Sequence, residues 1–148
     1  FLQTVVEAIA DHAGGNLTAD ALARLTPDQI TLWAYVILRD ELCDGGFIQL
    51  IHNGYGPFFF LNPFAKAMRL WGMKDFSKLL YRARELYELH AEALTQPCTD
   101  EEFMALYEQF PEFDDLDDAF MEREEEFTNG VAHYLDEHLT DFIDITHG

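Results

Sequence analysis

The sequence has few cysteines, few basic residues and no long apolar run. Its two cysteines, Cys43 and Cys98, form no Cys-x-x-Cys pair, so neither a disulfide framework nor a cysteine zinc site is expected. No apolar stretch reaches the ~18 residues that a membrane-spanning helix requires. These absences predict a chain that does not enter the membrane, and the sparse cysteines favour the reducing cytoplasm.

The common catalytic and cofactor motifs are also absent. The sequence lacks Gly-x-Ser-x-Gly, Gly-x-x-x-x-Gly-Lys-[Ser/Thr], the dinucleotide fingerprint and His-Glu-x-x-His. No histidine has a glutamate three residues before it, which argues against the Glu-x-x-His pairs of a helical di-iron site. The sequence therefore predicts a protein that is not an enzyme and uses no cofactor.

Two weaker chemical readings remain open. Cys43 and His52 could act as nucleophile and base, although a buried structural cysteine is the simpler interpretation. His133, Glu137 and Asp141 recur at helical spacing beside His138, so one helix face could offer metal ligands. A solvated acidic face with incidental histidines explains the same pattern, and no metal site is predicted.

Hydrophobic periodicity indicates helices throughout the chain. Thr26-Pro27-Asp28-Gln29 and Thr99-Asp100-Glu101-Glu102 both match the capping box that begins helices. Gly45-Gly46 is expected to end the helix that starts at Pro27, and Phe47 to Asn53 to form one or two further helical turns. The final helix is expected to start near Asp115. Because no segment alternates apolar and polar residues as a strand would, we predict an all-α bundle of about six to eight helices, without a sheet. Residues 1–148 are expected to form a single domain.

Negative charge is concentrated in the last third of the chain. The net charge is −19, and residues 99–148 hold 17 Asp and Glu against one Arg, a net of −16. Such a field repels nucleic acid and anionic lipid, and it attracts basic proteins. We therefore expect no direct nucleic-acid or membrane binding and a basic protein as the partner.

The densest acidic segment is the candidate partner-binding surface. Like charges three or four residues apart destabilise a helix, so something other than stability can favour them, although a charge run is most often only a solvated face. Nine carboxylates fall within fifteen positions: Glu112, Asp114, Asp115, Asp117, Asp118, Glu122, Glu124, Glu125 and Glu126.

Residues 43–53 carry a resemblance to a known family. They read Cys-Asp-Gly-Gly-Phe-Ile-Gln-Leu-Ile-His-Asn and resemble the Asn-Gly-Gly-Phe-x-Gln-x-x-x-Asn signature of a bacterial family named for a DNA-mimic protein. The likeness covers about residues 26–95, and Asp44 stands where the family usually has Asn. The residues we interpret as determinants of the fold are Trp33, Gly45, Gly46, Phe47, Gln49 and Asn53. The resemblance implies an all-helical fold, no cofactor, and carboxylates that stand in for DNA phosphates.

Two functions follow from these observations. The first is a non-catalytic module, a DNA mimic whose acidic surface occupies a basic DNA-binding protein such as a transcription regulator. The alternative is a helical domain that holds a small ligand or a partner helix through the aromatic region Phe58–Phe64. The uneven charge and the surplus of aromatic residues also favour a homodimer.

Overall fold

The computed structural model describes residues 2–12, 23, 25–60 and 64–138, and within them the chain is helical without any strand. Seven helices are defined there: α1 (Leu2–His12), α3 (Pro27–His52), α4 (Gly56–Phe60), α5 (Phe64–Leu70), α6 (Lys74–Leu94), α7 (Asp100–Gln109) and α8 (Glu112–Glu137). The predicted all-α class is therefore confirmed. None of the helices in these ranges combines the length and apolar composition that a membrane crossing requires.

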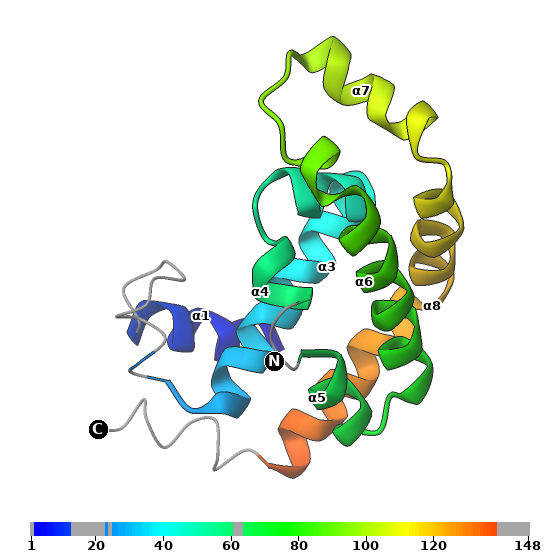
Figure 1. The fold of residues 1–148 in the computed structure, drawn as a ribbon. Coiled ribbons are helices and arrows are strands. Elements are labelled where there is room, and N and C mark those ends of the chain that lie inside the picture. The colour runs from blue at the N-terminus through cyan, green and yellow to red at the C-terminus, as the bar shows by residue number, and fades with distance from the viewer. Residues whose placement is uncertain (1, 13–22, 24, 61–63, 139–148) are drawn as a thin grey trace.

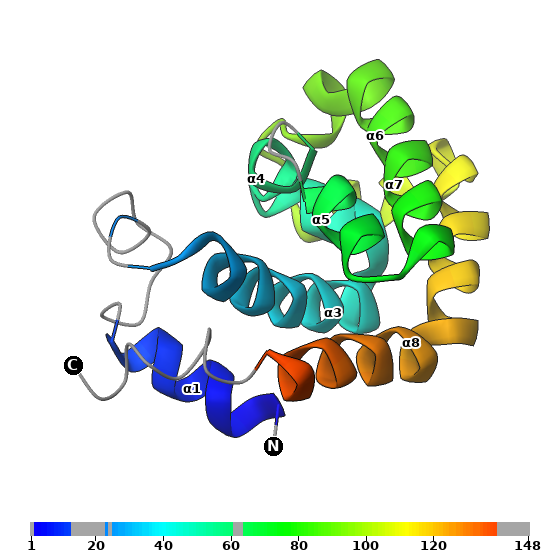
Figure 2. The same cartoon turned by 90° about the horizontal axis from the view of Figure 1, so that it is seen from below.

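Helix α3 is the centre of the arrangement. It packs against α1, α6 and α8, and α6 in turn packs against α4, α5 and α8. Figure 2 shows α1 and α8 on one side of α3, with α5 and α6 on the other side. Helix α7 lies at one end of the molecule, and the chain then returns along the body as α8 (Figure 1). The acidic helix α8 therefore packs along α3 and α6, with its other side toward solvent.

Both predicted capping boxes are present. At the start of α3, the Thr26 hydroxyl accepts from the Gln29 N–H at 3.2 Å, and the Gln29 side chain accepts from the Thr26 N–H at 2.9 Å. Thr99 and Glu102 make the same reciprocal pair at the start of α7, at 3.2 and 3.1 Å. Each pair satisfies two backbone donors that the helix itself leaves open, and losing such a cap costs about 1 kcal/mol.

The helix predicted to end at Gly45-Gly46 does break there, and the further helical turns predicted for residues 47–53 follow at once. Gly46 has φ 75° and ψ −169°, and α3 continues beyond this kink to His52. These angles are accessible essentially to glycine alone. The glycine pair therefore redirects the helix, and residues 47–52 form its second part.

Aromatic side chains join the three central helices. The ring of Phe76 in α6 stacks on Phe127 in α8 at 4.6 Å between centroids and meets the edge of Tyr35 in α3 at 5.9 Å. The Tyr35 hydroxyl lies 2.8 Å from the Thr128 hydroxyl, and burial raises the pKa of Tyr35 to about 12. Phe76 and Tyr35 are completely buried, so the position of α8 is fixed by the core on its inner face.

Candidate functional site: the acidic face of α8

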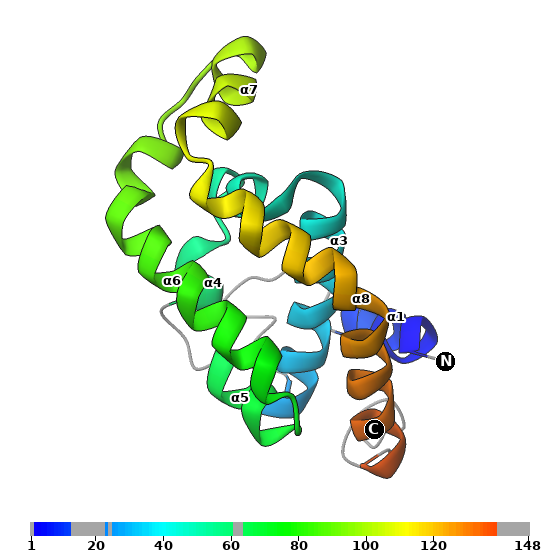
Figure 3. The same ribbon diagram turned by 90° about the vertical axis from the view of Figure 1, so that its right-hand side faces the viewer.

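All nine predicted carboxylates lie on α8. This helix begins at Glu112, three residues earlier than the expected start near Asp115, and so it also carries Glu112 and Asp114. Its apolar positions, from Phe113 and Leu116 to Val131 and Leu135, are buried, and the helix packs with that side against α3 and α6. Most of the acids at the positions between them are exposed, so the amphipathic period turns them away from the core. Figure 3 shows α8 running along the face of the molecule that is turned toward the viewer.

Seven of the nine are exposed, and we name this set the acidic strip. Helix geometry gives ~1.5 Å of rise per residue, so the strip extends over roughly 21 Å of the helix axis. Its members are Glu112, Asp114, Asp115, Asp118, Glu122, Glu125 and Glu126.

Few cations neutralise the strip. Arg123 lies within α8 and donates to Glu126 at 2.6 Å and to Asp75 of α6 at 2.9 Å. At the other end, His90 Nε2 lies 3.1 Å from Glu112 Oε2. Exposed pairs of this kind contribute little stability. Most of the repulsion between the carboxylates is therefore left to solvent and counterions.

Asp117 is turned toward the kink in α3. Its Oδ1 accepts the Phe47 N–H at 2.9 Å, so it satisfies a backbone donor at the start of the second part of α3. Burial, together with the neighbouring Asp114 and Asp118, raises the pKa of Asp117 to about 6, against the lowering effect of the Phe47 hydrogen bond. This carboxylate connects α8 to α3 and does not belong to the strip.

Glu124 is also engaged from within. The Thr128 hydroxyl donates to Glu124 Oε1 at 3.0 Å, which leaves the Thr128 oxygen to accept from the buried Tyr35 hydroxyl. A chain of hydrogen bonds therefore runs from the core to this half-buried glutamate. The sequence pattern could not separate Asp117 and Glu124 from the strip, since both fall in the same dense acidic run.

We expect Asp117→Asn to stabilise the protein at pH 7.5. Because the folded pKa of about 6 lies above the ordinary aspartate value of 3.8, the folded state holds this proton more tightly, and stability falls as pH rises from about 4 to about 6. The amide oxygen can still accept from Phe47 without carrying charge. The expected gain is about 1 kcal/mol after discounting for partial exposure. Thermal unfolding of both proteins across this pH range measures it.

The control for this experiment is Asp118→Asn, which removes the same charge from an exposed neighbour. It should shift the melting temperature less and leave the decline between pH 4 and pH 6 in place. A lower melting temperature for Asp117→Asn at pH 7.5 would show that the charged hydrogen bond to Phe47 outweighs the cost of burial.

Added salt should raise the melting temperature. The net charge of −16 over residues 99–148 makes the folded state self-repulsive, and salt shortens the range of that repulsion to about 10 Å at 0.1 M. An increase of several degrees is expected between about 20 and 300 mM NaCl in a thermal denaturation series. A flat response would mean that the folded state does not carry a net repulsion.

The signature residues gather around the kink in α3. Phe47 is buried at the kink and Trp33 is buried farther back in the first part of α3, and a Cβ on Gly45 would lie 2.0 Å from the Gln49 side chain. Gln49 donates to Glu41 and to Asp44, each at 2.9 Å, and Asn53 donates to Glu41 at 2.9 Å. Gln49 and Asn53 therefore bridge the two parts of α3 by binding carboxylates.

Two residues at this junction were missed by sequence reasoning. Glu41 accepts from both Gln49 and Asn53, and Tyr107 of α7 donates its hydroxyl to the Gly45 carbonyl at 2.7 Å. The spacing of Glu41, Gln49 and Asn53 by multiples of four is a signal for one helix face. It was hidden because the orientation of the second helical part relative to the first, across the glycine pair, cannot be derived from the sequence.

The alternative catalytic pair is not brought together. Cys43 is exposed, which corrects the expectation of a buried cysteine, and partial desolvation and Glu124 raise the pKa of its thiol. His52 instead lies beside Cys98, with 3.9 Å between Nε2 and Sγ, and its Nδ1 is 2.9 Å from the Leu94 carbonyl. The sequence placed His52 with the wrong cysteine because the loop after α6 could not be positioned.

The alternative metal face is only partly described. His133 and Glu137 form an exposed i,i+4 pair at 3.1 Å, whereas the His138 ring stacks on Tyr134 at 4.0 Å. Asp141 lies outside the described residues. Within the ranges that are described, no group of three or more His, Cys, Asp or Glu side chains is arranged to hold a metal ion.

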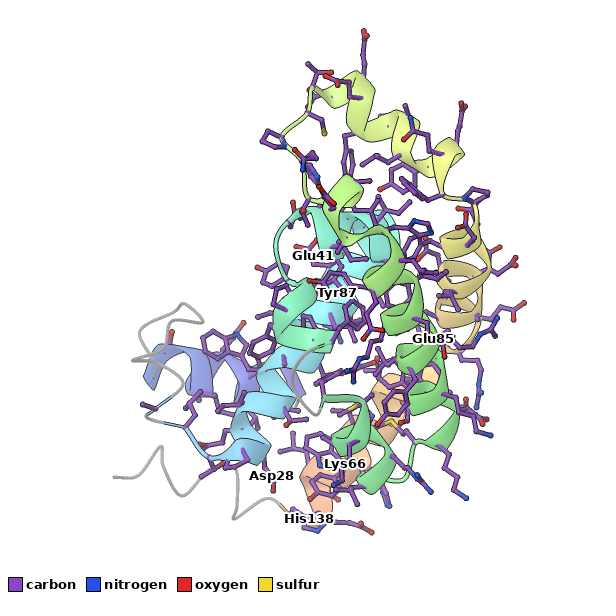
Figure 4. All side chains as sticks on the ribbon, in the orientation of Figure 1. Asp28, Glu41, Lys66, Glu85, Tyr87 and His138 are labelled. Carbon is purple, nitrogen blue, oxygen red and sulfur yellow. The ribbon has the colours of Figure 1, made fainter. Side chains whose placement is uncertain are left out.

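The aromatic region lies beside a separate apolar cavity. Phe59, Phe60 and Phe64 are buried and Phe58 is half-buried, while residues 61–63 lie outside the described part of the chain. A cavity of about 570 Å³ is lined by Phe58, Phe64, Trp71 and Tyr134, among others. Asp28 and Lys66, which Figure 4 labels, also contribute to its lining. This volume is within the usual range for small-molecule sites.

Comparison with known proteins identifies the family. The family model described as DMP19-like protein matches residues 23–138. A curated relative from Neisseria meningitidis serogroup B (strain ATCC BAA-335 / MC58), named DNA mimic protein DMP19, is 34% identical over 146 residues, which cover 98% of this chain and 88% of the relative. The resemblance carried by residues 43–53 is thereby confirmed, and the chain belongs to the family of DMP19-like proteins.

Proposed function

We propose that this chain is a DNA mimic that binds a basic DNA-binding protein, such as a transcription regulator, without catalysing a reaction. The binding surface is the acidic strip of α8. The observation that carries the proposal is the exposure of seven carboxylates along one helix. The name of the relative from Neisseria meningitidis supports the same function.

The spacing of the strip is comparable with that of one DNA strand. Seven carboxylates over roughly 21 Å of axis give about one charge per 3 Å, and each strand of a DNA duplex carries one phosphate per ~3.4 Å. A protein surface built to contact a row of phosphates with Lys and Arg would therefore meet a similar density of acceptors on α8. Carboxylates also accept bidentate hydrogen bonds from arginine, as phosphates do.

The strip is held on a fixed support. On the inner face of α8, the rings of Phe120 and Phe127 pack on Phe76 of α6. Asp117 accepts a hydrogen bond from the backbone of α3. Charges on such a scaffold need little ordering when a partner arrives, which lowers the entropic cost of binding. Binding then releases counterions from both surfaces, so the affinity should fall steeply as salt is added.

The same negative charge makes direct binding to nucleic acid unfavourable. We expect the protein to act in the cytoplasm, because a protein that binds cellular DNA would be met there.

The homodimer predicted from the sequence stays a prediction, and light scattering of the purified protein tests it. A twofold arrangement would place two acidic strips on one particle.

A capture experiment tests the proposed function. The protein is immobilised, exposed to lysate of its source cell and washed with increasing NaCl, and the retained proteins are identified. The expected result is a DNA-binding protein with a basic surface that elutes as salt rises, and that also elutes when its own duplex DNA is added. Retention that resists both salt and DNA would contradict mimicry by the strip.

The cavity beside the aromatic region supports a second candidate function, the binding of a small apolar ligand. Its lining is mainly apolar, with Ile30, Phe64 and Leu70 among its members. Titration with an apolar fluorescent dye distinguishes this second function from DNA mimicry. Dye binding in the cavity would be insensitive to salt and would not change when carboxylates of the acidic strip are substituted.

A further inference from the structure

A groove opens between the kink of α3, helix α7 and helix α8. Figure 1 shows α7 beyond the kinked end of α3 and next to the N-terminal part of α8. The groove has a volume of about 470 Å³, and its lining includes Asp44, Gln49, Met104, Tyr107, Asp117 and Met121. It adjoins the acidic strip, because Asp117 and Met121 lie between strip residues on α8.

Two methionines at this groove are exposed to solvent. Met104 of α7 is 62% exposed and Met121 of α8 is 50% exposed, which places them among the few large apolar side chains on the described surface. Methionine is unbranched and polarisable, so it adapts to different bound groups and is frequent at protein-binding surfaces. The two side chains offer apolar contact in the middle of a strongly acidic face.

The polar lining of the groove carries negative charge only. Asp44 comes from α3 and Asp117 from α8, and neither Lys nor Arg contributes to the lining. The carboxylate of Asp117 is partly desolvated, and its raised pKa of about 6 means that its ionised form would gain from a nearby cation. The hydroxyl of Tyr107 is already bound to the Gly45 carbonyl, which holds α7 against this end of α3.

We propose that this groove binds an arginine side chain of the basic partner, with the alkyl part against Met104 and Met121 and the guanidinium toward Asp117 and Asp44. The inference rests on the proposed function and deepens it. The acidic strip attracts any row of cations over a long range. The groove supplies one anchored contact, and a few such contacts usually carry most of the binding energy of an interface.

Arginine fits this groove better than other cations. A metal ion would not use the methionines, and no three metal-binding side chains are gathered within the described residues. An apolar helix would bury the charges of Asp44 and Asp117 without supplying a cation to offset them, which is costly. Arginine combines an apolar stem with a weakly hydrated, planar cation that stacks on aromatic rings such as Tyr107, whereas the ammonium of lysine holds its water more strongly.

Methyl NMR of the whole chain tests the proposal with a minimal probe. The four methionines are labelled with ¹³C at the methyl group, and the protein is titrated with N-acetyl-arginine amide. We expect saturable shifts of Met104 and Met121, with Met68 and Met73 as internal controls that stay in place. N-acetyl-citrulline amide, which has nearly the same shape without the charge, should give no saturable shift, and N-acetyl-lysine amide a weaker one.

Matched variants separate the groove from the general field of the protein. Asp117→Asn should weaken the binding of N-acetyl-arginine amide about tenfold, the order expected for one charged hydrogen bond. Asp118→Asn removes the same charge outside the groove and should change the affinity by less than about twofold. Equal loss in both variants, or equal shifts with citrulline, would overturn the proposal. Circular dichroism confirms that each variant is folded.

The groove and the strip can fail independently. If Met104→Ala together with Met121→Ala leaves capture of the DNA-binding partner unchanged while strip variants abolish it, the groove proposal is wrong and the proposed function stands. If the probe binds as described but no DNA-competed partner is captured, the arginine site stands and the mimic function is wrong. Loss of partner binding in the double methionine variant, with the fold intact, supports both.

Discussion

Neutralising four carboxylates of the acidic strip is expected to weaken binding of the captured DNA-binding partner about 100-fold at low salt. Each exposed charge pair across an interface contributes up to about 1 kcal/mol, and four add to roughly 2–3 kcal/mol, or about 100-fold in affinity. The substituted side chains are changed to their amides, which preserves shape: Asp114, Asp115, Asp118 and Glu122.

Asp117 is left unchanged in this variant because it supports the backbone at Phe47. A control variant removes four exposed carboxylates elsewhere, so that the net charge falls equally. Fluorescence anisotropy of the labelled partner gives both affinities, and the salt dependence should flatten only in the strip variant. Equal weakening in the two variants would show that net charge alone, and not the strip, determines binding. The control substitutions, again to amides, are at Glu7, Asp40, Glu85 and Glu92.

Gly46→Ala is expected to destabilise the fold by about 3 kcal/mol or more. The backbone at Gly46 has φ 75°, and a side chain in this region costs about 1–3 kcal/mol by itself. The added Cβ would also lie 2.3 Å from Asp117 Oδ2, so it would displace the carboxylate that accepts the Phe47 N–H. Chemical denaturation of the two proteins measures the loss.

Gly54→Ala is the matched control. Gly54 also has a positive φ, of 90°, but a Cβ there would meet nothing within 4 Å. Its loss should be limited to backbone strain, about 1–2 kcal/mol. If both alanines cost the same, the contact between Asp117 and the kink contributes nothing to stability, and the account of this junction is incorrect.

The fold was predictable wherever a local signal determined it. The capping boxes at Thr26 and Thr99 act within four residues, so the sequence contains the whole interaction. The break at Gly46 was predictable from the glycine pair, but the direction in which the second helical part continues was not. Asp117 and Tyr107 support that direction, and they are distant in sequence and meet α3 only in the folded chain.

The sequence predicted which residues make up the acidic run, but not which of them are exposed on the surface. The dense run of acids on α8 is visible in the sequence, and the period of buried residues such as Phe113 and Leu116 orients most of it outward. That Asp117 and Glu124 are bound from within depends on contacts with Phe47 and Thr128. The groove with Met104 and Met121 depends on the docking of α7 beside α8 and has no signal in the sequence.

The most direct test of DNA mimicry is competition for one partner. A labelled duplex bound to the captured DNA-binding protein is titrated with this chain, and anisotropy follows the release of the duplex. Mutually exclusive binding predicts complete release, with an apparent affinity for the duplex that weakens in proportion to the concentration of the added chain. Release that stops short of completion, with the duplex and the chain bound to the partner together, would contradict the claim that the acidic strip takes the place of DNA.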